Sequence, residues 1–158
     1  MPTNNITRLL DSRDINYSAF ELPDHIRSAP DTAQFLQVPL PLIYKSIVVE
    51  RKGRGKLILA VVPGDREVDT RALAKAAGAK KVTLTTRRKA EQETGLKAGG
   101  ISPLALINKG FDTYLDVESK KHPEIHVSGG ELGLNIRLPV KDLIRLTGAE
   151  LAPISQSS

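Results

Sequence analysis

Lys45 is the residue of this 158-residue chain whose position most favours chemistry. It enters a long apolar run, between Tyr44 and Ser46. Apolar neighbours on both sides confine the stem of a lysine and aim its ammonium group at one point, which is either water or a ligand. Lys45 is therefore a candidate ligand-binding group, and a solvated lysine at a strand edge is the alternative.

Two glycine-rich loops are the other candidates. In Gly99-Gly100-Ile101-Ser102-Pro103, the missing side chains let a ligand or another strand approach the main chain, and free N–H groups can bind an anion or a carbonyl oxygen. Ser128-Gly129-Gly130 could present a hydroxyl and two N–H groups at a pocket wall. Either loop alone could be an ordinary turn. Together with Lys45, they predict a single pocket formed mainly by backbone.

Several familiar kinds of chemistry are excluded or disfavoured. The chain has no cysteine, which excludes a disulfide, a thiolate metal site and a thiol nucleophile. It has neither a phosphate-binding P-loop nor a nucleophile elbow. His122 and His126 are four residues apart, but Pro123 prevents the helix that would put them on one face. We therefore expect no metal and no cofactor.

Positive charge is concentrated in the middle of the sequence. The net charge is +5, and the segment 45–97 holds 14 lysines and arginines against six aspartates and glutamates. Clustered cations favour an anionic partner such as a nucleic acid, and a solvated basic face is the alternative. The longest apolar run, Leu57–Val62, is too short to cross a bilayer, and the N-terminus does not resemble a signal sequence. The prediction is a cytoplasmic protein with no membrane partner.

Local patterns predict short elements that position these groups. Capping residues and apolar spacing predict helices over residues 5–12, 32–37, 70–77, 86–93 and 140–147. Expected N-caps include Asn4 or Asn5, Asp31 and Asp69, and Gly78 is an expected C-cap. Alternating and β-branched runs predict strands over residues 17–22, 43–50, 56–62, 80–85, 113–117, 125–128 and 133–138.

These elements predict an α+β or mixed α/β fold with six or seven strands and four or five short helices. The strands 43–50 and 56–62 form an expected antiparallel hairpin, which argues against a doubly wound parallel sheet. The length fits one domain over residues 1–158, with residues 153–158 as a frayed tail.

Longer runs resemble the YbaK/ProX family of aminoacyl-tRNA editing domains. The similarity runs in the family's order through residues 45–49, 59–82, 99–106 and 127–136, and it covers roughly residues 6–151. The family includes freestanding bacterial proteins and domains inserted in prolyl-tRNA synthetase. The resemblance implies a mixed, barrel-like sheet flanked by helices. It also implies hydrolysis of the ester that joins a wrong amino acid to the 3′ end of tRNA.

The resemblance implies roles for individual residues. Lys45 and Gly100 are expected to be catalytic. The expected substrate-binding residues are Leu22, Ser46, Gly99, Ile101, Ser102, Ser128, Gly129, Gly130 and Asn135. The first glycine-rich loop is most similar to that of the freestanding Cys-tRNA(Pro) deacylases, in which the thiol of the substrate attacks its own ester. Transfer RNA is the expected partner, and prolyl-tRNA synthetase is the second that the resemblance suggests.

Several positions depart from the family pattern around the expected amino-acid pocket. Ser46 replaces a threonine, Leu22 replaces a frequent tyrosine, and residues 27–29 lack the usual aromatic residue. Glu131-Leu132 stands where a basic pair is usual, and Asn135 stands where an acidic residue is frequent.

These departures leave other functions open. The amino acid removed could be alanine, serine or threonine instead of cysteine. A relative that binds tRNA or a synthetase without hydrolysis is a second alternative. An unrelated hydrolase with Ser102 or Ser128 as nucleophile is a third, but no histidine can be assigned as its base.

Overall fold

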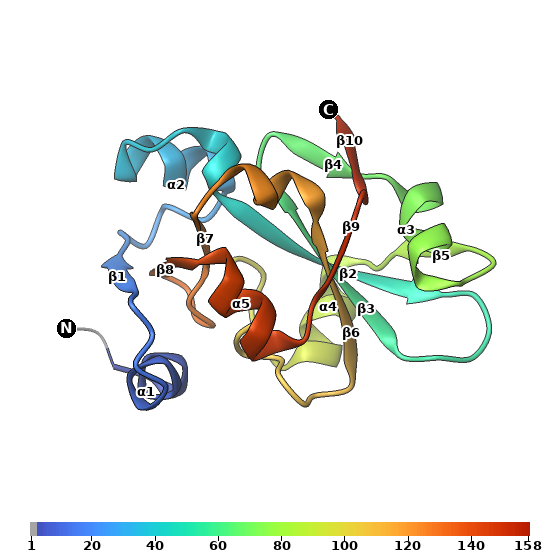
Figure 1. Ribbon diagram of the computed structural model, residues 1–158, viewed down its shortest axis with the longest axis horizontal. Coiled ribbons are helices and arrows are strands. Elements are labelled where there is room, and N and C mark those ends of the chain that lie inside the picture. The colour runs from blue at the N-terminus through green and yellow to red at the C-terminus, as the bar shows by residue number, and fades with distance from the viewer. Residues whose placement is uncertain (1–2) are drawn as a thin grey trace.

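The computed structural model describes residues 3–158, and Figure 1 shows how helices surround the strands. The α-helices of this part are α1 (Asn5–Ser12), α2 (Ala29–Leu36), α3 (Thr70–Ala77), α4 (Arg87–Thr94) and α5 (Val140–Thr147), with 3₁₀ helices η1 (Leu40–Leu42) and η2 (Val117–Lys121). Its strands are β1 (Ser18–Glu21), β2 (Tyr44–Arg51), β3 (Leu57–Pro63), β4 (Arg66–Val68), β5 (Val82–Leu84), β6 (Phe111–Asp116), β7 (Glu124–Ser128), β8 (Leu134–Pro139), β9 (Glu150–Ala152) and β10 (Ser155–Ser157). Across residues 3–158, no helix combines the length and the apolar character needed to cross a bilayer.

The strands form three sheets, of which the largest combines parallel and antiparallel pairs and the other two are antiparallel. The largest has the order β5-β2-β3-β6-β9, the second β1-β8-β7, and the third pairs β10 with β4. The β2–β3 hairpin is antiparallel, whereas β6 runs parallel to both β3 and β9. The mixed α+β fold and the central hairpin are therefore confirmed.

The expected barrel-like sheet is not found. A barrel requires the two edge strands of a sheet to pair with each other, but β5 and β9 lie at opposite edges of the five-stranded sheet. Among the described residues, one isolated bridge between Ile43 and His126 links this sheet to the three-stranded one. The sheets thus pack together without closing.

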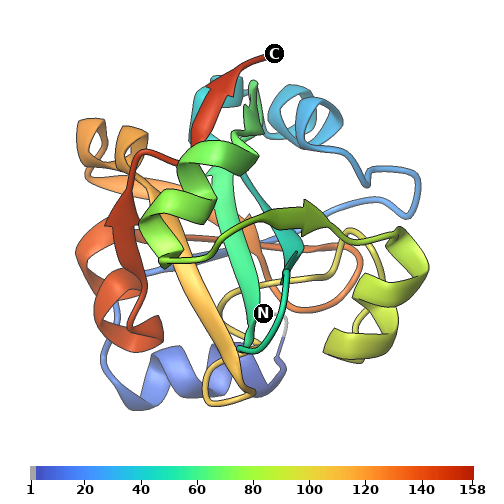
Figure 2. The ribbon, with the colours of Figure 1, turned by 90° about the vertical axis from the view of Figure 1, so that its right-hand side faces the viewer.

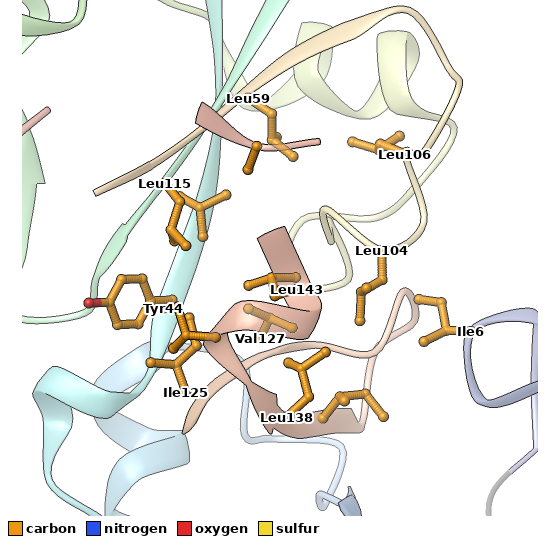
Figure 3. Packing of buried hydrophobic residues seen from close by; sticks show 14 of the residues in the cluster. Ile6, Tyr44, Leu59, Leu104, Leu106, Leu115, Ile125, Val127, Leu138 and Leu143 are labelled. Carbon is orange, nitrogen blue, oxygen red and sulfur yellow. The ribbon is translucent and has the colours of Figure 1, made fainter. Parts of the chain in front are cut away.

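Two hydrophobic clusters lie on opposite sides of the central hairpin. Alternate residues of a strand point to opposite faces, so Val48 packs in one cluster and Val49 in the other. In the first cluster, side chains from β3, β6, β7 and β8 meet Leu143 of α5 and Leu104 of the first glycine-rich loop (Figure 3). The second lies between the hairpin and α3, whose Leu73 is fully buried.

The helix caps named in the sequence analysis are confirmed with one exception, Asp31. Asn4 caps α1, Asp69 caps α3, and Gly78 ends α3 in the left-handed conformation, as predicted. Helix α2, however, begins at Ala29 rather than near residue 32, because Ser28 is its N-cap and accepts a hydrogen bond from the Asp31 N–H. Proline is well tolerated in a first helical turn, so the proline expected to end the preceding loop lies inside α2.

The sequence analysis missed three strands, β4, β9 and β10, so the expected six or seven strands become ten within residues 3–158. The tail at 153–158 was expected to fray, but Ser155–Ser157 pairs with β4. The buried carboxylate of Asp116 fixes the start of this tail. Its two oxygens accept hydrogen bonds from the N–H groups of Ile154, at 2.9 Å, and Glu118, at 3.2 Å.

We expect Asp116→Ala to lower the free energy of unfolding by about 2 to 4 kcal/mol, because it leaves the buried N–H of Ile154 and the partly buried N–H of Glu118 without an acceptor. Urea unfolding measures the loss, and hydrogen exchange at the Ile154 amide measures release of the tail. Asp116→Asn keeps one acceptor oxygen and should lose less. Unchanged stability and unchanged exchange in the alanine variant would show that Asp116 does not hold the tail.

Candidate functional site

A pocket of about 600 Å³ lies where the outer edge of β2 is left open. Strand β5 pairs only with Val49–Arg51, so the edge of Tyr44–Val48 has no neighbouring strand on that side. Thr85, directly after β5, donates from its N–H and its hydroxyl to the carbonyl of Val48, at 3.2 and 3.1 Å. The remaining walls come from the loop before α2, the start of α4, both glycine-rich loops and β8.

Seven of the predicted site residues line this one pocket. They are Leu22, Lys45, Ser46, Gly99, Ile101, Ser128 and Asn135. They come from segments up to 113 positions apart in the sequence, and the fold brings them together as the single-pocket prediction required. The other four, Gly100, Ser102, Gly129 and Gly130, belong to the two glycine-rich loops but do not line the pocket.

Lys45 reaches the pocket with a half-buried side chain. Its Nζ lies 3.4 Å from Oε1 of Glu67 on β4, which also lines the pocket. The Glu67 side chain is 60% exposed, so water competes for this ion pair and leaves the ammonium group available to a ligand. The neighbouring hydroxyl of Ser46 is buried and has no hydrogen-bond partner in residues 3–158.

The first glycine-rich loop packs against the second. A β-carbon at Gly100 would lie 3.1 Å from Cα of Glu131, and one at Gly99 would lie 3.0 Å from Cδ2 of Leu132. The Gly100 N–H donates to the carbonyl of Lys97 at 2.7 Å. Gly100 therefore allows two main chains to approach each other, and its N–H is already used.

Ser102 also has a structural position. It is fully buried, and its hydroxyl accepts a hydrogen bond from the Leu104 N–H at 3.2 Å, which fixes the turn after the glycines.

The second glycine-rich loop is supported by α1. The side-chain amide of Asn4 donates to the carbonyl of Gly129 at 2.9 Å, and a β-carbon at Gly130 would come within 2.6 Å of Cδ1 of Ile6. The N–H of Gly129 donates to Leu134, and the N–H of Gly130 donates to the Ser128 hydroxyl. These N–H groups are also engaged within the protein.

Free main-chain donors remain at the pocket, and two of them belong to the first glycine-rich loop. The N–H groups of Gly99 and Ile101 have no hydrogen-bond acceptor within residues 3–158, and both residues line the pocket. Donors held in place by a folded loop can stabilise a negative oxygen without reorganising. The site thus combines a lysine ammonium group with two free N–H groups.

Asn135 is oriented from behind by a buried histidine. Nδ1 of His126 lies 2.7 Å from Oδ1 of Asn135. Burial lowers the pKa of His126, although the hydrogen bond to Asn135 opposes that change. A neutral ring that donates from Nδ1 to Oδ1 leaves the amide NH₂ of Asn135 as the group that can face the pocket.

Sequence reasoning missed several residues around the pocket. The segment 85–87 lines it, and Glu67 pairs with Lys45. His126 was considered only for metal binding. The polar start of the helix at Thr86 could have indicated a ligand-binding position. It reaches the pocket through the pairing of β5 with β2, which local sequence does not predict. No group of three or more His, Asp or Glu side chains in residues 3–158 could hold a metal ion.

This fold and site correspond to a known class of protein. The family model for the aminoacyl-tRNA editing domain matches residues 23–146, which is most of the chain. The chain belongs to this family, and the resemblance recognised in the sequence is confirmed.

Individual relatives agree with this membership. A protein of Enterococcus faecalis named "Putative Cys-tRNA(Pro)/Cys-tRNA(Cys) deacylase EbsC" is 34% identical over 154 residues, 96% of this chain and 92% of that protein. A proline–tRNA ligase of Thermosipho africanus is 32% identical over 80 residues, 51% of this chain and 14% of the ligase.

Solved structures agree as well. One titled "Crystal structure of a putative trans-editing enzyme for prolyl tRNA synthetase" has a TM-score of 0.81 and 25% identity, and the match covers 99% of this chain and all of that one. The hypothetical protein APE2540 has a TM-score of 0.88 at 22% identity, over 97% of this chain and all of that chain, and shares the fold.

We expect the stability of the protein to fall as the pH drops below about 6.5, in a way that depends on His126. The folded protein disfavours the proton that the unfolded chain binds near the ordinary pKa of about 6.5. The contribution of neutral His126 to the free energy of unfolding is therefore complete above pH 6.5, and it is lost as the pH falls through the lowered pKa of the folded state.

Urea unfolding at pH 7.5 and pH 5.5 measures this effect. His126→Gln should lose less stability between the two pH values than the wild type, because other groups titrate equally in both. His25→Gln, at an exposed histidine, is the matched control and should behave as wild type. Equal losses in wild type and His126→Gln would refute the assignment.

Proposed function

We propose that this chain is a trans-editing aminoacyl-tRNA deacylase that acts as a single domain on mischarged tRNA in the cytoplasm, with Cys-tRNA(Pro) as the leading substrate. The observation that carries the proposal is the convergence of Lys45 with the free N–H groups of Gly99 and Ile101 at one pocket of an editing-domain fold. The name of the Enterococcus relative supports the choice of substrate.

The pocket supplies what ester cleavage needs. An aminoacyl ester is already activated, so orientation and stabilisation of the developing oxyanion provide most of the catalysis. The N–H groups of Gly99 and Ile101 are the proposed oxyanion donors, in place of those of Gly100 and Gly129, which are engaged elsewhere. Lys45 holds the terminal ribose and phosphate by its charge.

The nucleophile is proposed to come from the substrate. The thiol sulfur of a cysteinyl group forms a bond to the ester carbonyl carbon, and the bond between that carbon and the ribose oxygen breaks. The thiol proton passes to the ribose oxygen, so tRNA leaves with a free hydroxyl. Cysteine leaves as a cyclic thioester that water opens.

The contacts of Ser102 and Ser128 disfavour a serine nucleophile from the protein. Ser102 is fully buried. Ser128 lines the pocket, but its hydroxyl accepts from the Gly130 N–H, and nearby His126 bonds Asn135 instead. Neither serine has the adjacent base that would activate it.

A second candidate substrate is a tRNA charged with serine or threonine. Ser46, whose buried hydroxyl has no partner within residues 3–158, and Asn135 both line the pocket, and their polar groups are candidates to bond a hydroxyl side chain. With such substrates the substrate thiol is absent, and water would have to attack the ester.

A deacylation panel tests the proposal. Purified protein is mixed with tRNA(Pro) charged with cysteine, alanine, serine or threonine, and release of the amino acid is followed. We expect fastest release from Cys-tRNA(Pro) and a loss of roughly 100-fold in Lys45→Ala, because the variant lacks the cation that positions the substrate.

Lys109→Ala, which removes an exposed loop lysine away from the pocket, is the matched control and should retain wild-type activity. Fastest release of serine or threonine would select the second candidate. If no charged tRNA is hydrolysed but tRNA still binds, the protein is a non-catalytic binding module and the proposal is wrong.

A further inference from the structure

A second hollow in the protein surface is surrounded by positive charge. It lies between α3 and β5, and four of its lining residues are Arg71, Lys75, Lys80 and Lys81, which we call the α3–β5 basic surface. All four are exposed, and none forms an ion pair with another described residue. No carboxylate lines the hollow.

Nearby groups do not neutralise this surface. Asp69, one residue before the hollow, uses its carboxylate to cap α3 through the Ala72 N–H. The exposed Lys52 adds a further cation beside this surface. Its main-chain N–H donates to the carbonyl of Lys81 at 2.9 Å, which holds the two residues next to each other. Like charges held this close repel one another, and a bound polyanion would relieve that repulsion.

Strand β5 connects the basic surface to the editing pocket. Figure 2 shows it crossing the face of the molecule from the end of α3 to the start of α4. The strand leaves the hollow at Lys81 and reaches the pocket at Thr85, Thr86 and Arg87. Along an extended chain this is roughly 20 Å. Strand β5 is also an edge strand, so no other strand covers its outer side.

The other sides of the pocket carry acidic side chains. The segment 21–31 carries Glu21, Asp24 and Asp31 beside its one arginine, and the second glycine-rich loop carries the exposed Glu131. An anionic chain that ends in the pocket is therefore attracted along β5 rather than across the opposite wall.

We propose that the α3–β5 basic surface binds the phosphate backbone of the tRNA acceptor arm while its 3′ end occupies the pocket. The orientation of the RNA in this inference rests on the proposed function, which places the 3′ end in the pocket. Exposed lysines and arginines without partners are suited to phosphate contacts, which supply affinity without reading sequence. The surface therefore raises affinity for any tRNA and leaves the choice of amino acid to the pocket.

Two measurements test the surface with Lys80→Gln/Lys81→Gln. The first is binding of uncharged tRNA at several salt concentrations, which needs no hydrolysis. We expect binding roughly tenfold weaker at low salt, and a plot of log K against log salt less steep by about 1 to 2, because up to two phosphate contacts are lost. The second is cleavage of a short aminoacyl-adenosine ester, which should be unchanged because it cannot reach the surface.

The matched control is Lys120→Gln/Lys141→Gln, which removes the same charge from exposed lysines of η2 and α5. It should bind tRNA nearly as wild type does. The inference is overturned if the Lys80→Gln/Lys81→Gln variant binds tRNA as wild type with the same salt dependence, or if both double variants weaken binding equally. If the wild type binds tRNA through this surface but cleaves no ester, the proposed function fails while the binding surface stands.

Discussion

The short pairing between β5 and β2 is the constraint on which the pocket depends. Three residues of β5 cover only the end of the eight-residue β2, and the chain then turns into α4. The uncovered part of β2 presents Lys45 and Ser46 beside an open sheet edge. A longer β5 would extend the sheet over this edge and fill the space that the ligand needs. The same strand leads from the pocket to the α3–β5 basic surface.

The other wall depends on main-chain packing between the two glycine-rich loops. Glycine loses more conformational freedom on folding than other residues, and here that cost is offset by a contact that a β-carbon at Gly100 would obstruct. Helix α1 supports the second loop through Asn4, which lies 125 positions before Gly129 in the sequence. The rigidity of this wall is what would keep the N–H groups of Gly99 and Ile101 in place during ester cleavage.

The predictable parts of the structure are those fixed by local chemistry. Asn4, Asp69 and Gly78 act at helix ends through neighbours three or four residues away, so their roles are visible in the sequence. Strands β4, β9 and β10 were missed because pairing with distant segments defines them, rather than a local pattern of side chains. For the site, residue types predicted one pocket that includes Lys45. They could not show that Gly100 faces another loop, because a glycine does not indicate what approaches it.

The strands near both ends of the chain limit how far the protein can be shortened without exposing the edges of its sheets. The matched family segment, 23–146, omits α1 and β1 before it and β9 and β10 after it. Removing them would strip β4, β6 and β8 of a neighbour each and expose their backbone edges to pairing with other molecules. It would also remove the helix that supports the second glycine-rich loop. The family model thus covers most of the residues around the pocket, whereas the strands that protect the sheet edges lie outside the segment it matches.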